Sequence, residues 1–347
     1  MGNCLEHFFG FRAATYLMQK FRETKIRCEY LLYVWRYSVL PAVKLKADNM
    51  PLRWGIVTAG KISHDFVNAF NSYPDKGDQI ITAVAARDKS RAEQFAKTHN
   101  IAKVFDSYQD LAKSNDIDVA YIGALNPDHY ELTKLFLDSG KHVLCEKPLC
   151  LNYKQAESLI NYAKKKNLFL MEAVWSRFSP AYIALEKEIA AGKIGDVHFV
   201  EVNFGVPIYT VDRLRAVLDI GIYTIQFAQY IFKEMPVKVT AVGELNEDGV
   251  DLVDTIVLEY SGGRRAVLNV HSRVKLWNKA TVVGTTGRLT VNPFHFPDTL
   301  IGVDGKTQQF PLHSSKLSYN FYNSAGLVYQ AIEVARCIRE GNQMRRR

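Results

Sequence analysis

The sequence predicts an α/β protein with an N-terminal doubly wound domain and a C-terminal α+β domain built on a large, mainly antiparallel, open-faced sheet. Between residues 51 and 172, short apolar segments alternate with helical ones, which is typical of a parallel sheet covered on both faces. Within residues 173–347 the apolar residues recur with a period of two along longer segments. That alternation is typical of antiparallel strands with one covered face.

The first domain reads as a regular strand–helix alternation. Strands are expected at LRWGIV (52–57), IITAVAA (80–86), KVF (103–105), DVAYIGA (118–124) and HVLC (142–145). Helices are expected at KISHDFVNAFNSY (61–73), SRAEQFAKTHN (90–100), YQDLAKS (108–114) and DHYELTKLFLDSG (128–140). In the first of these helices Ile62, Phe66 and Phe70 share one side, as an amphipathic helix requires.

The second domain begins with a helix, PAYIALEKEIAAG, at 180–192. Strands then follow at VHFVEVNFG, KVTAVGEL, DTIVLEYS, RRAVLNVHSR, KATVVGTTG and RLTVN. Glycine-containing turns such as SGGR and TTGR connect several of them, as in β-hairpins. Because the open face of such a sheet is often covered by a partner subunit, we expect a homodimer through this domain.

Composition and charge exclude several classes of protein. The 347 residues, 48% of them hydrophobic, are enough for two domains. The net charge of +8 falls mostly on residues 1–50 and on the final three arginines, so a nucleic-acid-binding face is not expected. The five scattered cysteines indicate a reducing compartment, here the cytoplasm. No apolar run reaches the roughly eighteen residues of a transmembrane helix.

Residues 1–50 read as an extension outside the fold, because Met50 begins MPLRWGIV directly before the first strand. Two alternatives assign the extension a targeting role. MGNC resembles an N-myristoylation site beside a palmitoylated cysteine, although Glu6 stands where that motif has Ser or Thr. The basic, aromatic stretch 11–40 is compatible with a membrane-surface helix or a mitochondrial presequence.

A dinucleotide site is expected at the first strand–helix junction, WGIVTAGKIS. The G-x-G-x-x-G fingerprint falls on Thr58, Gly60 and Ser63, so only its middle glycine is present. Gly60 allows the backbone to approach a pyrophosphate, and the helix that starts at Lys61 and Ile62 offers free N–H groups. These residues predict a Rossmann domain.

The end of the second strand predicts NADP rather than NAD. An NAD-binding enzyme usually carries Asp or Glu there for the ribose 2′-hydroxyl, whereas this chain has Ala86 followed by Arg87 and Arg91. Two arginines suit a 2′-phosphate, and one net contact of about 1.4 kcal/mol gives a tenfold preference. The alternative is a solvated, charged helix start. No metal site is predicted.

The segment HVLCEKP places Glu146, Lys147 and Pro148 at the carboxyl end of a later strand, where the nicotinamide is expected. Pro148 ends the strand because it lacks an N–H. A lysine held there has a use in redox chemistry, since its charge lowers the pKa of a neighbouring acid.

Six segments, RWGIVTAGKIS, AARDKSRA, CEKP, LFLMEAVWSRF, LDIGIY and VVGTTGRL, occur in an order that resembles the Gfo/Idh/MocA oxidoreductase family over residues 51 to about 340. Within the family they are most similar to a dimeric, NADP-dependent branch. The resemblance implies oxidation of trans-dihydrodiols of aromatic hydrocarbons to catechols, or of aldoses such as D-xylose to lactones. Sequence alone does not rank these two substrates.

The resemblance also implies the site residues. Lys147 lines the active site, and Asp219-Ile-Gly-Ile-Tyr223 supplies the acid/base group, with Tyr where many relatives have His. A free tyrosine is only about 0.1% ionised at pH 7, so we expect Lys147 to favour the phenolate and Asp219 to orient the substrate or the lysine. The alternative for Tyr223 is packing within an apolar helix.

Further residues follow from the same resemblance. Trp175 and Phe204 match aromatic walls of the substrate pocket, although either is compatible with core packing. Asn126 and His129 match an N-x-x-H turn beside the cofactor, where Glu146 is also expected, and a lone histidine at a helix start is otherwise a cap.

The chain departs from the family pattern at two places. VDRLRAVLDIGIY lacks the glycine-rich stretch that relatives carry before the LD-x-G-x-Y segment, and REGNQMRRR stops before the final helix that relatives pack on the nucleotide domain. A misplacement of about 1 Å in a catalytic group can reduce a rate about a hundredfold. The alternative function is therefore a catalytically weak NADP(H)-binding protein.

Overall fold

The computed structural model describes residues 50–207 and 216–341. The predicted extension at 1–49 and most of the shortened stretch before Asp219 lie outside these residues. Internal contacts divide the chain into two units. The parallel-sheet unit contains the described residues up to Tyr182 and those from Phe310 on, and the antiparallel-sheet unit contains Ile183–Gln309.

The parallel-sheet unit is built on six parallel strands in the order β3-β2-β1-β4-β5-β6. Their bounds are β1 Leu52–Val57, β2 Gln79–Ala85, β3 Lys103–Phe105, β4 Val119–Ile122, β5 His142–Glu146 and β6 Leu170–Ala173. The chain starts in the middle of the sheet, winds outward to β3 and returns across β1 to β4. This is the doubly wound topology that the sequence predicts.

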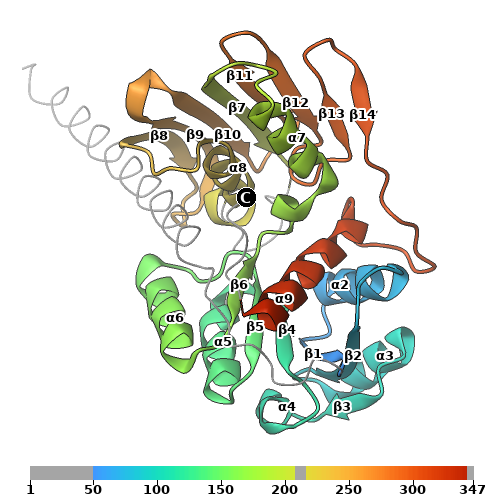
Figure 1. Cartoon of the computed structure of the whole chain (residues 1–347). Helices are drawn as coiled ribbons and strands as arrows, with labels where there is room; N and C mark the ends of the chain where they lie inside the picture. The colour runs from blue at the N-terminus through green and yellow to red at the C-terminus, as the bar shows by residue number, and fades with distance from the viewer. Residues whose placement is uncertain (1–49, 208–215, 342–347) are drawn as a thin grey trace, which may run out of the picture. The chain divides into compact units, whose positions relative to one another are not determined.

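Helices cover both faces of this sheet (Figure 1). They are α2 Lys61–Ser72, α3 Lys89–His99, α4 Tyr108–Lys113, α5 His129–Asp138, α6 Tyr153–Lys166 and α9 Val328–Glu340. Helices α2, α3 and α9 form one layer, in which α2 contacts both of the others, while α5 contacts α4 and α6 in the second layer. As the sequence predicts, α3 ends at Asn100, which adopts the left-handed conformation typical of a helix C-cap.

Aromatic side chains fill the space between α2 and the sheet. Trp54, Phe66, Phe70 and Tyr121 are all fully buried. The rings of Phe66 and Tyr121 stack with their centroids 3.8 Å apart. Because burying one such side chain contributes roughly 1.5–3 kcal/mol, this cluster fixes α2 against β1 and β4.

The C-terminal segment returns to the parallel-sheet unit. Helix α9 belongs to this unit and contacts α2 (Figure 1). Asp65 on α2 anchors the segment that leads to α9. Its buried carboxylate accepts hydrogen bonds from the backbone N–H groups of Asn320 and Phe321 at 2.8 and 2.9 Å, and from the Asn320 side chain at 2.8 Å.

The antiparallel-sheet unit contains eight strands in the order β14-β13-β12-β11-β7-β10-β9-β8. Their bounds are β7 Val197–Gly205, β8 Lys238–Leu245, β9 Asp251–Glu259, β10 Arg265–His271, β11 Lys279–Gly284, β12 Arg288–Asn292, β13 Thr299–Ile301 and β14 Thr307–Gln309. Every neighbouring pair is antiparallel except β7 and β10. The predicted mainly antiparallel sheet is therefore confirmed.

Helix α8, Ile222–Phe232, packs on β7 and β10 of this sheet, and the irregular helix η3, Ala216–Gly221, leads into it. Buried and more exposed residues alternate along β9 and β10, as the period-two pattern predicts. The chain passes between the two units within α7, Pro180–Ala190. In the described part of the chain, no helix is long and apolar enough to span a lipid bilayer.

Candidate active site

The turn after β1 has the backbone shape of a glycine turn, although its first fingerprint position is not a glycine. Thr58 occupies that position with φ of +84°, a conformation that is strained for a β-branched residue. Its hydroxyl donates a hydrogen bond of 2.8 Å to the carbonyl of Gly123 at the end of β4. This bond offsets part of the strain and ties the turn to the neighbouring strand.

Gly60 follows as the N-cap residue of α2. No side chain caps this helix, and its first turn holds no acidic residue, so the N–H groups at its start remain available to an anion. A Cβ added to Gly60 would meet its nearest neighbours, the Gly123 carbonyl and the Thr58 hydroxyl, at 3.9 Å. The polypeptide itself therefore does not require glycine here, which points to a ligand that approaches the backbone.

A cavity of about 400 Å³ opens at this helix start. Gly60, Lys61 and Arg91 contribute to its wall, so a helix N-terminus and two cationic side chains surround the same space. Such a space suits a phosphate-bearing ligand. The remaining lining residues are Ala59, His64, Gln94, Phe95, Thr98, His99, Ser318, Tyr319 and Asn320.

Arg87 and Arg91 flank the N-cap of α3, Asp88, and both are exposed. No carboxylate among the described residues forms an ion pair with either guanidinium group. Tyr108 at the start of α4 belongs to the same neighbourhood: burial raises the pKa of its hydroxyl, while the charge of Arg87 and a hydrogen bond from the Arg87 backbone act in the opposite direction. Sequence reasoning missed Tyr108, because only the fold brings α4 to the end of β2.

The Glu146–Lys147–Pro148 segment forms a turn at the carboxyl end of β5. Glu146 is buried, and its carboxylate accepts a 2.8 Å hydrogen bond from the hydroxyl of Tyr121. Burial raises the pKa of Glu146, and that hydrogen bond and the charge of Lys147 oppose the shift. Lys147 itself is only half-buried and precedes a cis peptide bond to Pro148.

Asn126 and His129 follow β4, as the N-x-x-H turn implies. Asn126 begins the 3₁₀ helix η1, Asn126–Asp128, and His129 begins α5. His129 is fully buried, with Nδ1 2.7 Å from the Pro148 carbonyl and Nε2 3.0 Å from the Ala124 carbonyl. The polar groups of His129 and Glu146 thus have partners within the protein, which support this edge of the sheet. Direct contact of the two residues with a cofactor stays a prediction.

Asp219 and Tyr223 lie in the antiparallel-sheet unit. Asp219 is part of η3, which has π-helical hydrogen bonding, and Tyr223 is in the first turn of α8. Single π-helical turns occur frequently at functional sites. The carboxylate of Asp251 on β9 accepts a 2.6 Å hydrogen bond from the backbone N–H of Val217, which anchors the start of η3 to the sheet.

Phe204, Tyr223 and His295 form an aromatic cluster. The ring of Phe204 stands edge-on to Tyr223 with centroids 5.7 Å apart and lies parallel to His295 at 5.2 Å. His295 also approaches Tyr223 edge-on at 6.1 Å. The structure thus brings the predicted wall residue Phe204 and the predicted acid/base Tyr223 together. Sequence reasoning missed His295, because its segment NPFHFP shows no motif.

The predicted residues therefore fall into two groups, one in each unit. The parallel-sheet unit holds the residues predicted to bind the nucleotide, Lys147, and Trp175 in the short helix η2, Trp175–Phe178. The antiparallel-sheet unit holds Phe204, Asp219 and Tyr223.

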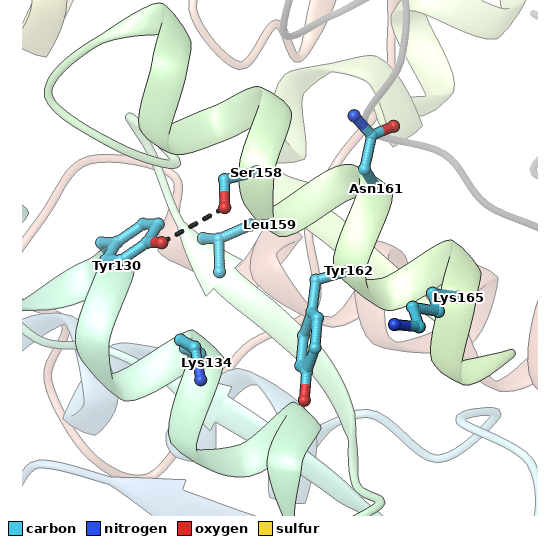
Figure 2. Close-up of a pocket in the computed structure, with 7 residues that line it drawn as sticks. All are labelled: Tyr130, Lys134, Ser158, Leu159, Asn161, Tyr162 and Lys165. Atoms are coloured by element: carbon cyan, nitrogen blue, oxygen red, sulfur yellow. Dashed lines mark hydrogen bonds between the residues drawn. The ribbon is translucent and has the colours of Figure 1, made fainter.

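A second hollow, of about 290 Å³, lies between α5 and α6 (Figure 2). Two pairs of its lining residues interact. The hydroxyl oxygens of Tyr130 and Ser158 are 3.2 Å apart, and Nζ of Lys134 lies 5.1 Å from the ring centroid of Tyr162. None of the predicted site residues lines it. It is a groove between two surface helices, and we assign it no part in the site.

Two family models match most of the chain. The model described as "Oxidoreductase family, NAD-binding Rossmann fold" matches residues 52–174, and the GFO/IDH/MocA C-terminal domain matches residues 182–290. The chain belongs to the Gfo/Idh/MocA oxidoreductase family. Its parallel-sheet unit is accordingly an NAD(P)-binding Rossmann domain, which confirms the predicted family and fold.

Curated relatives are similar along nearly their whole length. The trans-1,2-dihydrobenzene-1,2-diol dehydrogenase of Xenopus laevis is 43% identical over 300 residues, which cover 84% of this chain and 91% of the relative. The human protein of the same name is 41% identical over 301 residues, with 84% and 90% covered.

Among solved structures, a 3-ketoreductase from Actinomadura kijaniata in complex with NADP and TDP-benzene is 25% identical. Its TM-score is 0.72, with 84% of this chain and 91% of that chain covered. An oxidoreductase from Agrobacterium radiobacter with bound NAD+ and L-tartaric acid, at 17% identity and a TM-score of 0.68, shares the fold alone.

Proposed function

We propose that the protein is an NADP-dependent dehydrogenase that oxidises a vicinal diol, with trans-1,2-dihydrobenzene-1,2-diol converted to catechol as the reference reaction. The observation that carries this proposal is the similarity, 43% identity over 84% of the chain, to a relative named for that substrate. The site residues support it, because an uncapped helix start that suits a phosphate, a lysine in a turn and a tyrosine beside aromatic side chains are the groups that such a reaction needs.

Preference for NADP over NAD is part of the proposal. Ala86 stands at the carboxyl end of β2, where an NAD-binding enzyme usually has Asp or Glu, and exposed Arg87 and Arg91 follow it. The carboxylate of the intervening Asp88 caps α3. The 3-ketoreductase from Actinomadura kijaniata binds NADP. We expect Arg87→Ala to raise the KM for NADP about tenfold or more while leaving that for NAD within about twofold, since one charge-assisted hydrogen bond contributes roughly 1.5–3 kcal/mol. Equal effects on both cofactors would contradict the assignment.

Bound NADP would supply the hydride acceptor for the carbinol carbon, and Tyr223 would take the proton of the substrate hydroxyl. The alcohol becomes a ketone, and the hydroxyketone formed from a dihydrodiol tautomerises to the aromatic catechol. By the family resemblance, Lys147 would favour the phenolate of Tyr223 through its positive charge, and Asp219 would orient the substrate or the lysine. Trp175 and Phe204 supply flat apolar walls, which suit a cyclohexadiene ring and also the C–H face of a sugar.

Aldoses such as D-xylose are the alternative substrates, because they present vicinal hydroxyl groups to the same side chains. We also propose a cytoplasmic homodimer that associates through the antiparallel sheet. Large apolar side chains exposed on that unit, Val242 at 65% and Trp277 at 80%, support this association. The second candidate function is NADP(H) binding with little turnover, favoured by the shortened segment before Asp219.

Formation of NADPH, followed at 340 nm with purified protein and NADP, tests the proposal. We expect turnover with trans-benzene dihydrodiol or D-xylose, and the ratio of kcat/KM values identifies the preferred substrate. Tyr223→Phe removes only the hydroxyl and should reduce kcat at least a hundredfold while NADP binding is retained. Tight NADPH binding without turnover of either substrate would favour the binding-only function.

A further inference from the structure

The turn that carries Lys147 is held from two sides by buried ionisable groups that the proposed chemistry does not use. Glu172 on β6 accepts a 2.7 Å hydrogen bond from the backbone N–H of Leu149. His129 on α5 places Nδ1 2.7 Å from the carbonyl oxygen of Pro148. The Pro148 carbonyl and the Leu149 N–H group, which directly follow Lys147, are thus held by His129 as donor and by Glu172 as acceptor.

The surroundings of His129 define the hydrogens on its ring. Nδ1 faces the Pro148 carbonyl at 2.7 Å and Nε2 faces the Ala124 carbonyl at 3.0 Å. Carbonyl oxygens only accept hydrogen bonds, whereas a neutral imidazole has one donor and one acceptor nitrogen. A neutral ring would aim a nitrogen lone pair at one of the two oxygens. Turning the ring over would instead place a carbon about 2.7 Å from an oxygen, closer than even a weak C–H···O contact.

We propose that His129 is held with hydrogens on both ring nitrogens and that, together with Glu172, it is a positioning pair that fixes the turn carrying Lys147. The proposal rests on the proposed function only in that Lys147 there meets the reacting groups. The ionic form of His129 and its two hydrogen bonds are properties of the folded protein, whatever the enzyme oxidises.

Buried charge of the opposite sign is available to balance the ring. His129 is fully buried, and Glu172 is 7% exposed. Burial raises the pKa of Glu172 to about 7, while the Leu149 N–H group, His129 and Lys147 each act in the opposite direction. Above pH 7, Glu172 is therefore an anion that attracts a charged His129, which is the arrangement that a buried ion needs.

The other ionisable groups at this edge come from neighbouring strands. Tyr121 on β4 donates to Glu146, whose own pKa burial raises. Burial also raises the pKa of the Cys145 thiol on β5, so this thiol stays neutral at working pH. Glu146 and Glu172 are thus the anions that these strands contribute around His129.

Nuclear magnetic resonance of protein labelled with 15N-histidine tests the ring directly. The His129 signals are those that disappear in His129→Gln. We expect both ring nitrogens of His129 to show the shifts of protonated nitrogens from pH 6.5 to 8.5. In Glu172→Gln the ring should lose one proton within that range. One protonated and one bare nitrogen in the wild-type protein at pH 7.5 would overturn the proposal, and this outcome does not depend on catalytic activity.

Kinetics tests the positioning of Lys147. Glu172→Gln keeps an oxygen for the Leu149 N–H group, whereas Glu172→Ala removes it. We expect Glu172→Ala to lower kcat at least tenfold with the Kd for NADP within about twofold, and Glu172→Gln to restore most of kcat. A loss that is the same in both variants, or that falls on Kd instead, would overturn the positioning role. If wild-type protein turns over neither substrate, the proposed function fails, and the resonance experiment still decides the state of His129.

Discussion

Ser63 on α2 lies directly against Gly123 at the end of β4: a Cβ added to Gly123 would stand 2.3 Å from the Ser63 hydroxyl oxygen. In the dinucleotide fingerprint the third glycine allows the helix to approach the strand. Here Ser63 occupies that third position and is fully buried, and the missing side chain is on the strand instead. Helix and strand still approach closely because the glycine of this contact, Gly123, stands on the strand side and not on the helix. Relative to the fingerprint, the two elements have exchanged the positions of the glycine and the larger residue.

This exchange predicts that Gly123→Ala destabilises the protein by about 1–3 kcal/mol, the usual cost of overpacking a core. Besides the serine hydroxyl, the added methyl group would meet the ring of Tyr121 at 3.2 Å. Combining Gly123→Ala with Ser63→Gly should recover part of the loss, because the second change removes the obstructing hydroxyl. Urea denaturation of the four proteins measures the coupling. Strictly additive effects would contradict the proposed exchange.

Substitution of Gly60, unlike that of Gly123, should weaken cofactor binding and leave the stability nearly unchanged. We expect Gly60→Ala to change the free energy of unfolding by less than about 1 kcal/mol, since a Cβ there meets nothing closer than 3.9 Å. The same methyl group would stand where a pyrophosphate approaches the start of α2, so NADP should bind at least tenfold more weakly. Calorimetric titration and thermal unfolding of the same sample measure both quantities. A stability loss with unchanged affinity would assign Gly60 to packing.

Asp65 anchors the C-terminal segment to the Rossmann domain through bonds to the backbone of Asn320 and Phe321. We expect Asp65→Ala to lower the free energy of unfolding by about 3 kcal/mol, because two backbone N–H groups and one side-chain amide lose a buried, charged acceptor. Asp65→Asn keeps one side-chain oxygen and should lose less. Chemical denaturation compares the two variants. Equal losses would show that the cavity, not the hydrogen bonds, determines the effect.

His142 at the start of β5 gives the stability a defined pH dependence. Its Nδ1 accepts a 2.9 Å hydrogen bond from the backbone N–H of Phe169, so the folded state needs this nitrogen unprotonated. Burial lowers the pKa of His142 from 6.5 to about 4. Between these values the unfolded chain binds a proton that the native state does not, so stability falls as pH falls, by up to about 3 kcal/mol.

The control for this dependence is His142→Gln, whose amide oxygen can accept the same N–H group but does not titrate. Urea denaturation of both proteins at several pH values from 7 to 4.5 gives the comparison. The wild type should lose more stability than the variant over this range. Parallel curves for the two proteins would remove His142 as the source.

The sequence predicted the fold well because its signals are local. Apolar periodicity predicts the five strands β1 to β5 and the helices α2 to α5, and Asn100 marks the end of α3. The return of residues 310–341 to the Rossmann domain was not predicted. It depends on hydrogen bonds that the carboxylate of Asp65 accepts from a segment more than 250 positions away along the chain, and no local pattern encodes such a pairing.

The site was predictable where a family motif marks it and not elsewhere. Gly60, Lys147 and Tyr223 stand in segments to which the sequence assigns a role. Tyr108 and His295 lie outside the family segments, and Glu172, although it stands in LFLMEAVWSRF, was not selected. Glu172 lies in an apolar strand and reads as part of the core, and only the register of β5 with β6 brings it to the turn after Lys147. His295 approaches Tyr223 through the packing of a loop, which has no sequence signature.

Isotope labelling tests most directly whether the protein transfers hydride from the diol to NADP. Trans-benzene dihydrodiol carrying deuterium on both carbinol carbons would be incubated with the protein and NADP, and the nucleotide analysed by mass spectrometry. We expect reduced nucleotide that carries one deuterium, formed more slowly than with the unlabelled diol and at least a hundredfold more slowly with Tyr223→Phe. Tight binding of NADP without any labelled NADPH would contradict it.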